Sequence, residues 1–190
     1  MTTSSSLALA FAASLALAST GLADDKAGSA DPMAGWAPPV VKNEKKDRQE
    51  IEALLKKMEA ASTKGDLDAA AALIDFPVLM VTDNAKGEGG GETWTQAQWS
   101  EVMKPFYAKP APPGSQTQGK RTIVLISDSL ALVGAGWTMK MGPRKVSGTS
   151  GLLLIRKGGT WKAKAMVEGG WGDVPMPGTA QGQATPAPTK

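Results

Sequence analysis

The chain of 190 residues contains neither cysteine nor histidine. Without cysteine it forms no disulfide and offers no thiol for lipid attachment, so its stability has to come from a packed core. The two absences together exclude nucleophilic triads built on Cys or His, zinc sites made of thiolates or imidazoles, and histidine pH switches. We therefore expect neither a metal site nor a cofactor.

The chain also lacks an apolar run long enough to cross a membrane. The most apolar run, Leu7–Leu17, is too short to span a bilayer as a helix. It lies within the uncharged residues 1–23, which end in small residues that a signal peptidase reads, and Asp24 and Asp25 follow. We expect a signal peptide over 1–23, an exported (periplasmic or secreted) protein, and no integral membrane segment after cleavage. No Lys or Arg precedes the run, so a wrongly assigned start codon and a buried alanine-rich helix are the alternatives.

Acidic residues are scarce in the second part of the chain. Residues 1–119 carry a net charge of −4 and residues 120–190 carry +7. The cations alternate along expected strands or lie at turns, where lysine also discourages edge-to-edge aggregation. They are not accompanied by the aromatic and basic motif of a known nucleic-acid reader, so we expect no nucleic-acid partner.

Two terminal segments contain few residues that a core could use. Residues 24–45 are rich in Gly, Ala, Pro and charge, and residues 174–190 are rich in Pro, Gly, Ala and Thr. We expect a flexible leader over 24–45 and a disordered tail over 174–190. A single folded domain is expected over residues 46–173.

The domain is expected to open with two helices and a strand. The first helix has one apolar face, made of Ile51, Leu54, Leu55 and Met58. Lys64 and Gly65 end it, and Asp66 is placed to cap the next, alanine-rich helix. Pro77 stops that second helix, and a short apolar strand follows over 77–82.

Glycine is concentrated in the next segment, Asp83–Glu92. It is not a phosphate-binding loop, because no Gly-Lys-Ser/Thr is present and Glu92 stands where the dinucleotide pattern has its third glycine. Nor does it have calcium-loop spacing, since Ala85 and Gly87 occupy ligand positions. We expect a flexible loop at the rim of a pocket.

A helix is predicted after this loop. Thr95–Gln98 form a capping box, and Trp94 and Trp99 form the matching hydrophobic staple. The helix is expected to run to about Lys104 and to end at Pro105.

Four strands are predicted from Thr122 onward by alternation of apolar and polar residues: 122–127, 130–141, 146–156 and a last strand that begins at Trp161. On the last strand, Ala163 and Val167 belong to the apolar face. Glu168 falls on the face of Lys162 and is expected at the surface.

The long amphipathic helix, the Gly65–Asp68 break, the alanine-rich second helix and the immediate strand resemble the opening of the nuclear transport factor 2-like superfamily, which includes SnoaL-like polyketide cyclases and ketosteroid isomerases. The resemblance covers about residues 46–173. It implies an α+β fold in which a curved antiparallel sheet wraps around a long N-terminal helix, as a cone or cystatin-like roll. It also implies a pocket at the open end.

The large apolar residues expected to line that pocket are Met58, Met80, Trp94, Trp99, Phe106, Trp137, Met139 and Met141. Each of them is equally suited to a hydrophobic core. A cavity rich in methionine and tryptophan adapts readily to apolar molecules, so we expect a small apolar ligand. A homodimer formed through the sheet is the other expected partner.

The similar steroid isomerases use a carboxylate base at the end of the first strand, with a tyrosine and a protonated aspartic acid as oxyanion donors. The resemblance puts Asp83 at the base position but Met58 at that of the tyrosine, and we find no inward aspartate on the late strands. A solvated turn residue is the other reading of Asp83. Two hypotheses result: a non-catalytic ligand-binding domain, and an isomerase or cyclase that uses Asp83. The first is favoured because oxyanion donors supply most of the catalysis.

Overall fold

The computed structural model describes residues 37–110, 112, 114–141 and 143–173. The expected signal peptide, most of the expected leader and the expected tail lie outside the described residues, as does the side chain of Met141.

The chain opens with α1 (Glu44–Lys64) and α2 (Leu67–Ala71). Gly65 ends α1 in the left-handed conformation, and a Cβ there would collide with the carbonyl oxygen of Tyr107, so a glycine is required. The Asp66 carboxylate accepts a hydrogen bond from Ala69 N at 2.9 Å and caps α2. The break between the helices is therefore as predicted.

The second helix is shorter than predicted. The helix was predicted to run up to Pro77, but Ile74 already begins β1 (Ile74–Asp83) and pairs with Ala163. Ala163 N also donates to the Leu73 carbonyl at 3.0 Å. Pro77 lies inside this strand, after a cis bond from Phe76. Pairing with a distant strand thus takes these residues from the helix.

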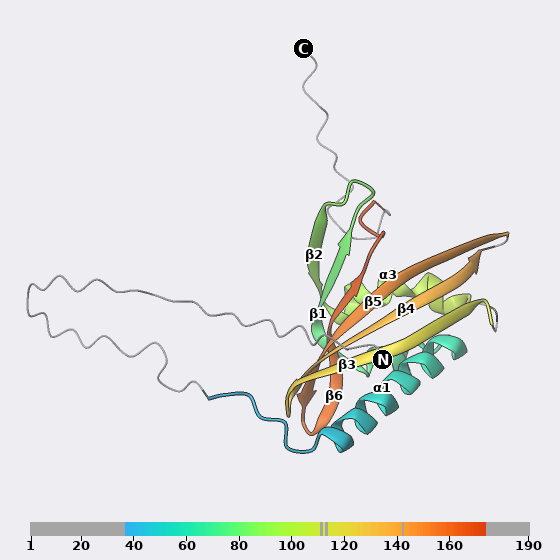
Figure 1. The fold of residues 1–190 in the computed structure, drawn as a ribbon. Helices are drawn as coiled ribbons and strands as arrows, with labels where there is room; N and C mark the ends of the chain where they lie inside the picture. The colour runs from blue at the N-terminus through green and yellow to red at the C-terminus, as the bar shows by residue number, and fades with distance from the viewer. Residues whose placement is uncertain (1–36, 111, 113, 142, 174–190) are drawn as a thin grey trace, which may run out of the picture. The chain divides into compact units, whose positions relative to one another are not determined.

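Six strands form one curved sheet in the order β2-β1-β6-β5-β4-β3 (Figure 1). The other strands are β2 (Gly89–Trp94), β3 (Gln116–Ser127), β4 (Leu130–Met141), β5 (Arg144–Lys157) and β6 (Thr160–Glu168). Neighbouring strands are antiparallel except β1 and β6, which are parallel. The sheet is therefore mixed, whereas the expected sheet was antiparallel throughout.

The glycine-rich segment is not a long loop. Gly89 to Glu92 belong to β2 and pair with β1, and only a short turn remains between the strands. Within that turn, Asn84 Oδ1 accepts hydrogen bonds from Lys86 N at 3.0 Å and Glu88 N at 2.9 Å. The prediction of a flexible rim was wrong here, because backbone pairing with β1 orders residues whose own propensity for a strand is low.

The predicted capping box begins α3 (Gln96–Ala108), and this prediction is confirmed. Gln98 N donates to Thr95 Oγ1 at 3.3 Å, and Thr95 N donates to the Gln98 side chain at 2.9 Å. The predicted end at Pro105 was wrong. The helix continues because the aromatic rings beyond the proline pack on other elements: Tyr107 against Trp99, with ring centroids 6.1 Å apart, and Phe106 against Trp171, at 5.9 Å.

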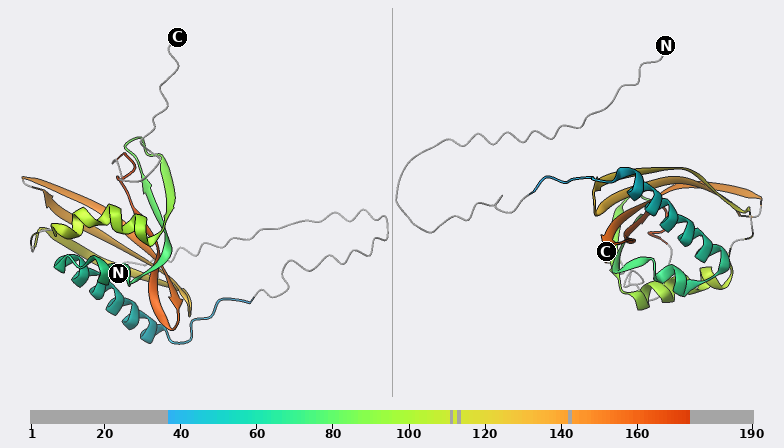
Figure 2. Two further views of the ribbon diagram at one scale, coloured as in Figure 1. Left: turned by 180° about the vertical axis from the view of Figure 1, so that it is seen from behind. Right: turned by 90° about the horizontal axis from the view of Figure 1, so that it is seen from below.

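The helices α1 and α3 lie on the concave side of the sheet, which curves around them (Figure 2). The largest fully buried side chains of this core come from helices and strands alike: Ile51, Val78, Trp99 and Leu154. Burying such apolar surface is the main contribution to stability in a chain without disulfides.

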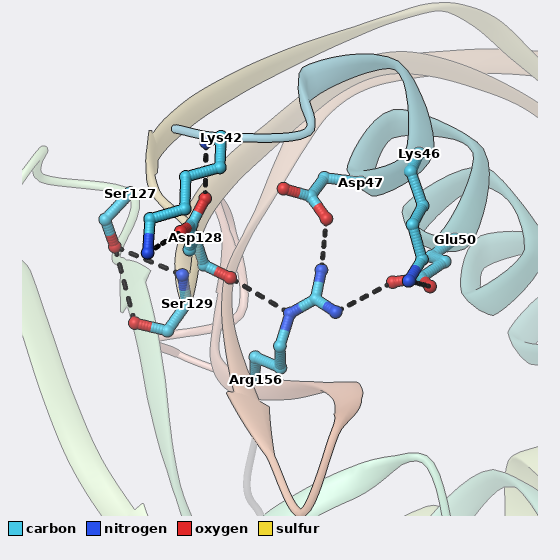
Figure 3. A network of polar contacts seen from close by, with 8 residues as sticks. All are labelled: Lys42, Lys46, Asp47, Glu50, Ser127, Asp128, Ser129 and Arg156. Atoms are coloured by element: carbon cyan, nitrogen blue, oxygen red, sulfur yellow. Dashed lines mark hydrogen bonds and ion pairs between the residues drawn. The ribbon is translucent and has the colours of Figure 1, made fainter. Parts of the chain in front are cut away.

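An arginine ties the start of α1 to the sheet (Figure 3). The Arg156 guanidinium contacts Asp47 and Glu50 of α1, at 3.0 Å for Glu50, and donates to the Asp128 carbonyl at 2.9 Å. It also lies 4.7 Å from the ring centre of Trp161. Asp47 and Arg156 are largely shielded from water, so the pair satisfies charges that would otherwise be costly to bury.

A bulge in β6 reverses which residues face inward. Leu154 pairs with Ala163, but Leu153 pairs with Ala165, so Lys164 is the extra residue. Because strand side chains alternate, Glu168 now faces the concave side and not the surface, and that prediction was wrong.

Lys164 is held in the bulge by two acceptors of β1. Its Nζ lies 3.0 Å from Asp75 Oδ2 and 2.7 Å from the Pro77 carbonyl. Lys157 donates to Asp75 Oδ1 at 2.7 Å. Hydrogen bonds from Lys157 and then Lys164 hold the pKa of the buried Asp75 carboxyl below its usual value.

Candidate functional site on the concave face

Packing on the concave face decreases toward the end where the parallel strands β1 and β6 finish. On β1, Val78 is fully buried, whereas the next two inward residues, Met80 and Thr82, are only partly buried. On β6, Met166 and Glu168 are likewise partly buried. We call these inward residues, Met80, Thr82, Met166 and Glu168, the open end of the concave face.

Glu168 lies between hydroxyl-bearing residues of the two neighbouring strands. It is directly opposite Ser150 on β5. On its other side, Val81 of β1 pairs with Val167, so Thr82 is the next β1 residue beside Glu168.

The Glu168 carboxyl is partly removed from water. Burial raises its pKa above the usual value near 4.5, and a hydrogen bond from the Trp171 side chain partly opposes this shift. Among the described residues Glu168 makes no ion pair. A carboxyl in this state holds a proton more readily than one in water, and its oxygens accept hydrogen bonds.

The chain turns back across the end of β1 after Glu168. We call residues 169–173 the return segment; in Figure 1 it is the last coloured stretch before the grey C-terminal trace. Four hydrogen bonds hold it: Gly170 N to Asp83 Oδ1 at 2.6 Å, Trp171 N to Thr82 Oγ1 at 3.0 Å, Gly172 N to the Asp83 carbonyl at 2.8 Å, and Ala85 N to Asp173 Oδ2 at 2.6 Å.

Glycines let the return segment approach β1 this closely. Gly170 has a left-handed φ of 89°, and a Cβ on Gly172 would lie 2.8 Å from the Asp83 carbonyl oxygen. The ring of Trp171 packs edge-to-face on Phe106 of α3, at an interplanar angle of 80°. Trp171 therefore links the end of the sheet to the helix opposite.

The structure places Asp83 at the end of β1, as the resemblance implied. Strand alternation assigns it to the face of Val81 and not to the concave face of Thr82, and its carboxylate accepts the hydrogen bond from Gly170 N. Its suggested role as a base stays a prediction. Met58, at the position where the resemblance implies a tyrosine, is partly buried against the core. Burial raises the pKa of Tyr107, the only tyrosine of the chain.

The other predicted pocket residues are distributed as follows: Trp94 and Trp99 are buried in the core, Met80 packs against it, Trp137 and Met139 are partly buried on β4, and Phe106 is 48% exposed. Trp137 lies against Gly148, where a Cβ would be 2.5 Å from its ring. Only Met80 belongs to the open end as defined above.

Three residues of this region were missed from the sequence: Thr82, Glu168 and Trp171. The sequence contained a signal for Trp171, since a large aromatic residue surrounded by Gly169, Gly170 and Gly172 is unusual in a loop. No sequence signal reported the β6 bulge, which decides the direction of Glu168.

A groove of about 420 Å³ runs between α1 and the edge strand β3, away from the open end. Its charged groups have partners within the fold: Arg48 donates to the Ile123 carbonyl at 2.8 Å, and Arg121 pairs with Glu52 and Glu59. Arg48 thereby covers one of the free carbonyls of the sheet edge, which discourages pairing with another chain.

Two further observations concern the described part of the chain alone. It contains no group of three or more acidic residues arranged to hold a metal ion. It also contains no helix that is long and apolar enough to cross a membrane.

No protein-family model and no curated protein sequence matches the chain. Solved structures with the same fold do match. An NTF2-like protein of unknown function from Shewanella oneidensis MR-1 superimposes with a TM-score of 0.54 at 20% identity, covering 65% of this chain and 98% of that one. Another from Pseudomonas putida KT2440 gives 0.53 at 12% identity, covering 65% and 86%.

A protein with a cystatin-like fold from Burkholderia xenovorans LB400 gives a TM-score of 0.50 at 17% identity, covering 67% of this chain and 93% of that one. At these identities the likeness concerns the fold. The NTF2-like α+β architecture predicted from the sequence is therefore confirmed.

Proposed function

We propose that this NTF2-like domain binds a small, largely apolar molecule at the open end of its concave face, without transforming it. The observation that carries the proposal is the position of the Glu168 carboxyl: it is partly buried on the concave face, between Ser150 and Thr82, and has no ion-pair partner among the described residues. Removing a carboxyl from water is unfavourable, and residues kept in such a state often serve a site.

The chemistry of the open end suggests the kind of ligand. Met80 and Met166 offer flexible, polarisable surface to an apolar body. Glu168, with Ser150 and Thr82 beside it, offers hydrogen bonds to one polar group of the ligand. A neutral molecule with one hydroxyl or carbonyl group fits this combination best, because an anion would lie beside a carboxyl.

The test is a titration of the chain 24–190 with the neutral apolar probe N-phenyl-1-naphthylamine. Met80→Gln should weaken binding about tenfold or more. Val81→Gln is the matched control, because Val81 is the adjacent β1 residue on the opposite face, and it should bind as the wild type does. Equal affinities in both variants would contradict the proposed location.

A carboxyl whose pKa is raised by burial also suits an acid–base enzyme, which is the second candidate function. An isomerase or cyclase would use Glu168 or, as the family resemblance implies, Asp83. The test is a screen with hydrophobic ketones and polyketide-like esters, comparing Glu168→Gln and Asp83→Asn with the wild type. Turnover that one of these changes abolishes while binding persists would replace the non-catalytic proposal.

We propose further that the domain forms a homodimer through the convex face of the sheet. A row of apolar side chains crosses five neighbouring strands in register on that face: Val124, Leu132, Leu153, Ala165 and Leu79. Val124 is 50% exposed, Leu132 45% and Leu79 41%, which is much apolar surface for one face.

Sedimentation velocity tests the dimer. Leu132→Asp should shift the wild-type dimer to monomer, because a charge would be buried at the interface. Val146→Asp, on the opposite face of the same sheet, is the control and should stay dimeric. A monomeric wild type at micromolar concentration would overturn this part of the proposal.

Export is proposed on the sequence of residues 1–25. Cleavage after Ala23 should give a mature chain that begins at Asp24. Intact-mass measurement on fractions of the native host tests this, and full-length chain in the cytoplasm would contradict it.

A further inference from the structure

The return segment is attached to the domain at two places by different means. Its backbone is bound to the end of β1 through Asp83 and Thr82. Its one large side chain, Trp171, contacts Phe106 of α3 and donates to Glu168. The segment thus lies at the open end and contacts the residue that carries the proposed function.

The attachment to β1 is polar and local, which makes it easy to release. Gly169, Gly170 and Trp171 lie outside the hydrophobic core cluster, and the backbone on both sides of the tryptophan is glycine. Glycine allows large changes of φ and ψ, so the segment can swing without moving β6. Two carboxylates hold the segment: Asp83 Oδ1 accepts from Gly170 N, beside the tryptophan, and Asp173 Oδ2 accepts from Ala85 N, at the far end of the segment.

We propose that Trp171 is a ligand-contacting gate residue of the concave site and that Asp83 is the latch that positions it. In this structure Asp83 holds Gly170 and Gly172, and Trp171 packs on Phe106 and donates a hydrogen bond to Glu168, which we take as the closed gate. Release of the latch admits the ligand, and closure places the indole against the bound molecule. The inference rests on the proposed ligand-binding function, and it assigns to Asp83 the placement of Trp171 and not proton transfer.

Stopped-flow binding of N-phenyl-1-naphthylamine to the chain 24–190 tests the gate. Trp171→Ala should raise the dissociation rate about tenfold, since ligand contact is lost and the gate no longer closes. Gly172→Ala should act in the same direction, because its Cβ would meet the Asp83 backbone. Gly89→Ala is the control: a Cβ there meets nothing within 4 Å and φ is ordinary, so wild-type rates are expected.

Two changes at Asp83 separate a latch from a base. Asp83→Asn keeps a carbonyl oxygen that accepts from Gly170 N, so wild-type binding rates are expected. Asp83→Ala loses the acceptor and should dissociate as fast as Trp171→Ala. A base would behave differently, because both variants would abolish turnover to the same extent.

Hydrogen exchange on the ligand-free protein tests whether Asp83 holds the return segment. The Gly170 and Gly172 amides should exchange about tenfold faster in Asp83→Ala than in the wild type, with Asp83→Asn close to wild type and thermal midpoints confirming that all variants fold. Unchanged exchange would overturn the latch, and unchanged binding rates in Trp171→Ala would overturn the gate. A wild type that binds no probe would overturn the proposed function and the ligand contact of Trp171, while the exchange result would still stand for the latch.

Discussion

The chemistry of Glu168 is set by its surroundings in the fold. Burial on the concave face raises the pKa of its carboxyl, and the Trp171 side chain opposes this by donating a hydrogen bond. The same glutamate on the convex face would be solvated and unremarkable. Its direction depends on Lys164, the extra residue of the bulge four positions earlier.

The raised pKa of Glu168 predicts a specific pH dependence of stability. Below its unfolded value near 4.5 the carboxyl is protonated in both states and has no effect. As the pH rises, the carboxyl ionises more readily in the unfolded state than in the folded state. Glu168 therefore lowers the free energy of unfolding, and this loss of stability is complete above the pKa of the folded state. Glu168→Gln should therefore match the wild type near pH 4 and exceed it at pH 7, as measured by urea unfolding. If the stabilities of the two proteins differed by the same amount at every pH, the raised pKa of Glu168 would be contradicted.

At the scale of a single element, α3 shows a strong local start and an end decided by its surroundings. Its first turn is closed by side chains within four residues of each other, from Thr95 to Gln98. Its last turn lacks the hydrogen bond that Pro105 cannot donate, and the contacts of Phe106 and Tyr107 offset that loss.

Removal of the cap tests the start of α3. Thr95→Ala should lower the free energy of unfolding by about 0.5–2 kcal/mol, because Gln98 N loses its acceptor. Gln96→Ala, at an exposed position of the same turn, is the control and should change stability little. Equal stability of both variants would mean that the helix does not begin at this cap.

The bulge in β6 is the other element whose form can be tested. Deleting Lys164 would remove the bulge and join Ala163 to Ala165, which leaves Met166 and Glu168 on the concave face. The variant should still fold, but with a thermal midpoint below that of Lys164→Ala, because it loses the bonds of Lys164 and also the local bend that the bulge gives β6. Lys164→Ala keeps the bulge and loses only the bonds to Asp75 and Pro77, so it should remain folded with reduced stability. Circular dichroism during thermal unfolding compares the two. A deletion variant as stable as Lys164→Ala would show that the bulge is dispensable.

On the scale of the whole molecule, the parallel pairing of β1 with β6 brings together residues almost ninety positions apart, such as Asp75 and Lys164. This pairing makes one sheet of the β1–β2 hairpin and the later strands. It also brings the end of β1 to the return segment, and so assembles the open end.

Truncation tests which residues belong to the folded unit. A chain of residues 38–173 keeps the described contacts and should unfold as the full chain does. A chain of 46–173, the domain expected from composition, loses the Asn43 carbonyl that accepts from Asp47 N and the 2.6 Å bond from Lys42 N to Asp128. Its thermal midpoint should be lower. Equal midpoints would place residues 38–45 outside the fold.

The sequence alone determined the features that short-range interactions control. The Gly65 break and the Asp66 and Thr95 caps all depend on residues within a few positions of one another. Local hydrogen bonds and side-chain periodicity act in the same way whatever the rest of the chain does. For this reason the α+β class and the order of the elements other than β2 could be predicted.

Where the local preference is weak, or is opposed by distant partners, the tertiary structure alone decided which secondary structure a residue adopts and which way its side chain faces. Gly89 to Glu92 became a strand because β1 supplies hydrogen bonds, and Ile74 left the helix because Ala163 pairs with it. Glu168 turned inward through a bulge whose lysine binds Asp75. Pairing between distant strands sets register, and a shift of one residue moves a side chain to the other face, so the candidate site could not be derived from the sequence without the sheet.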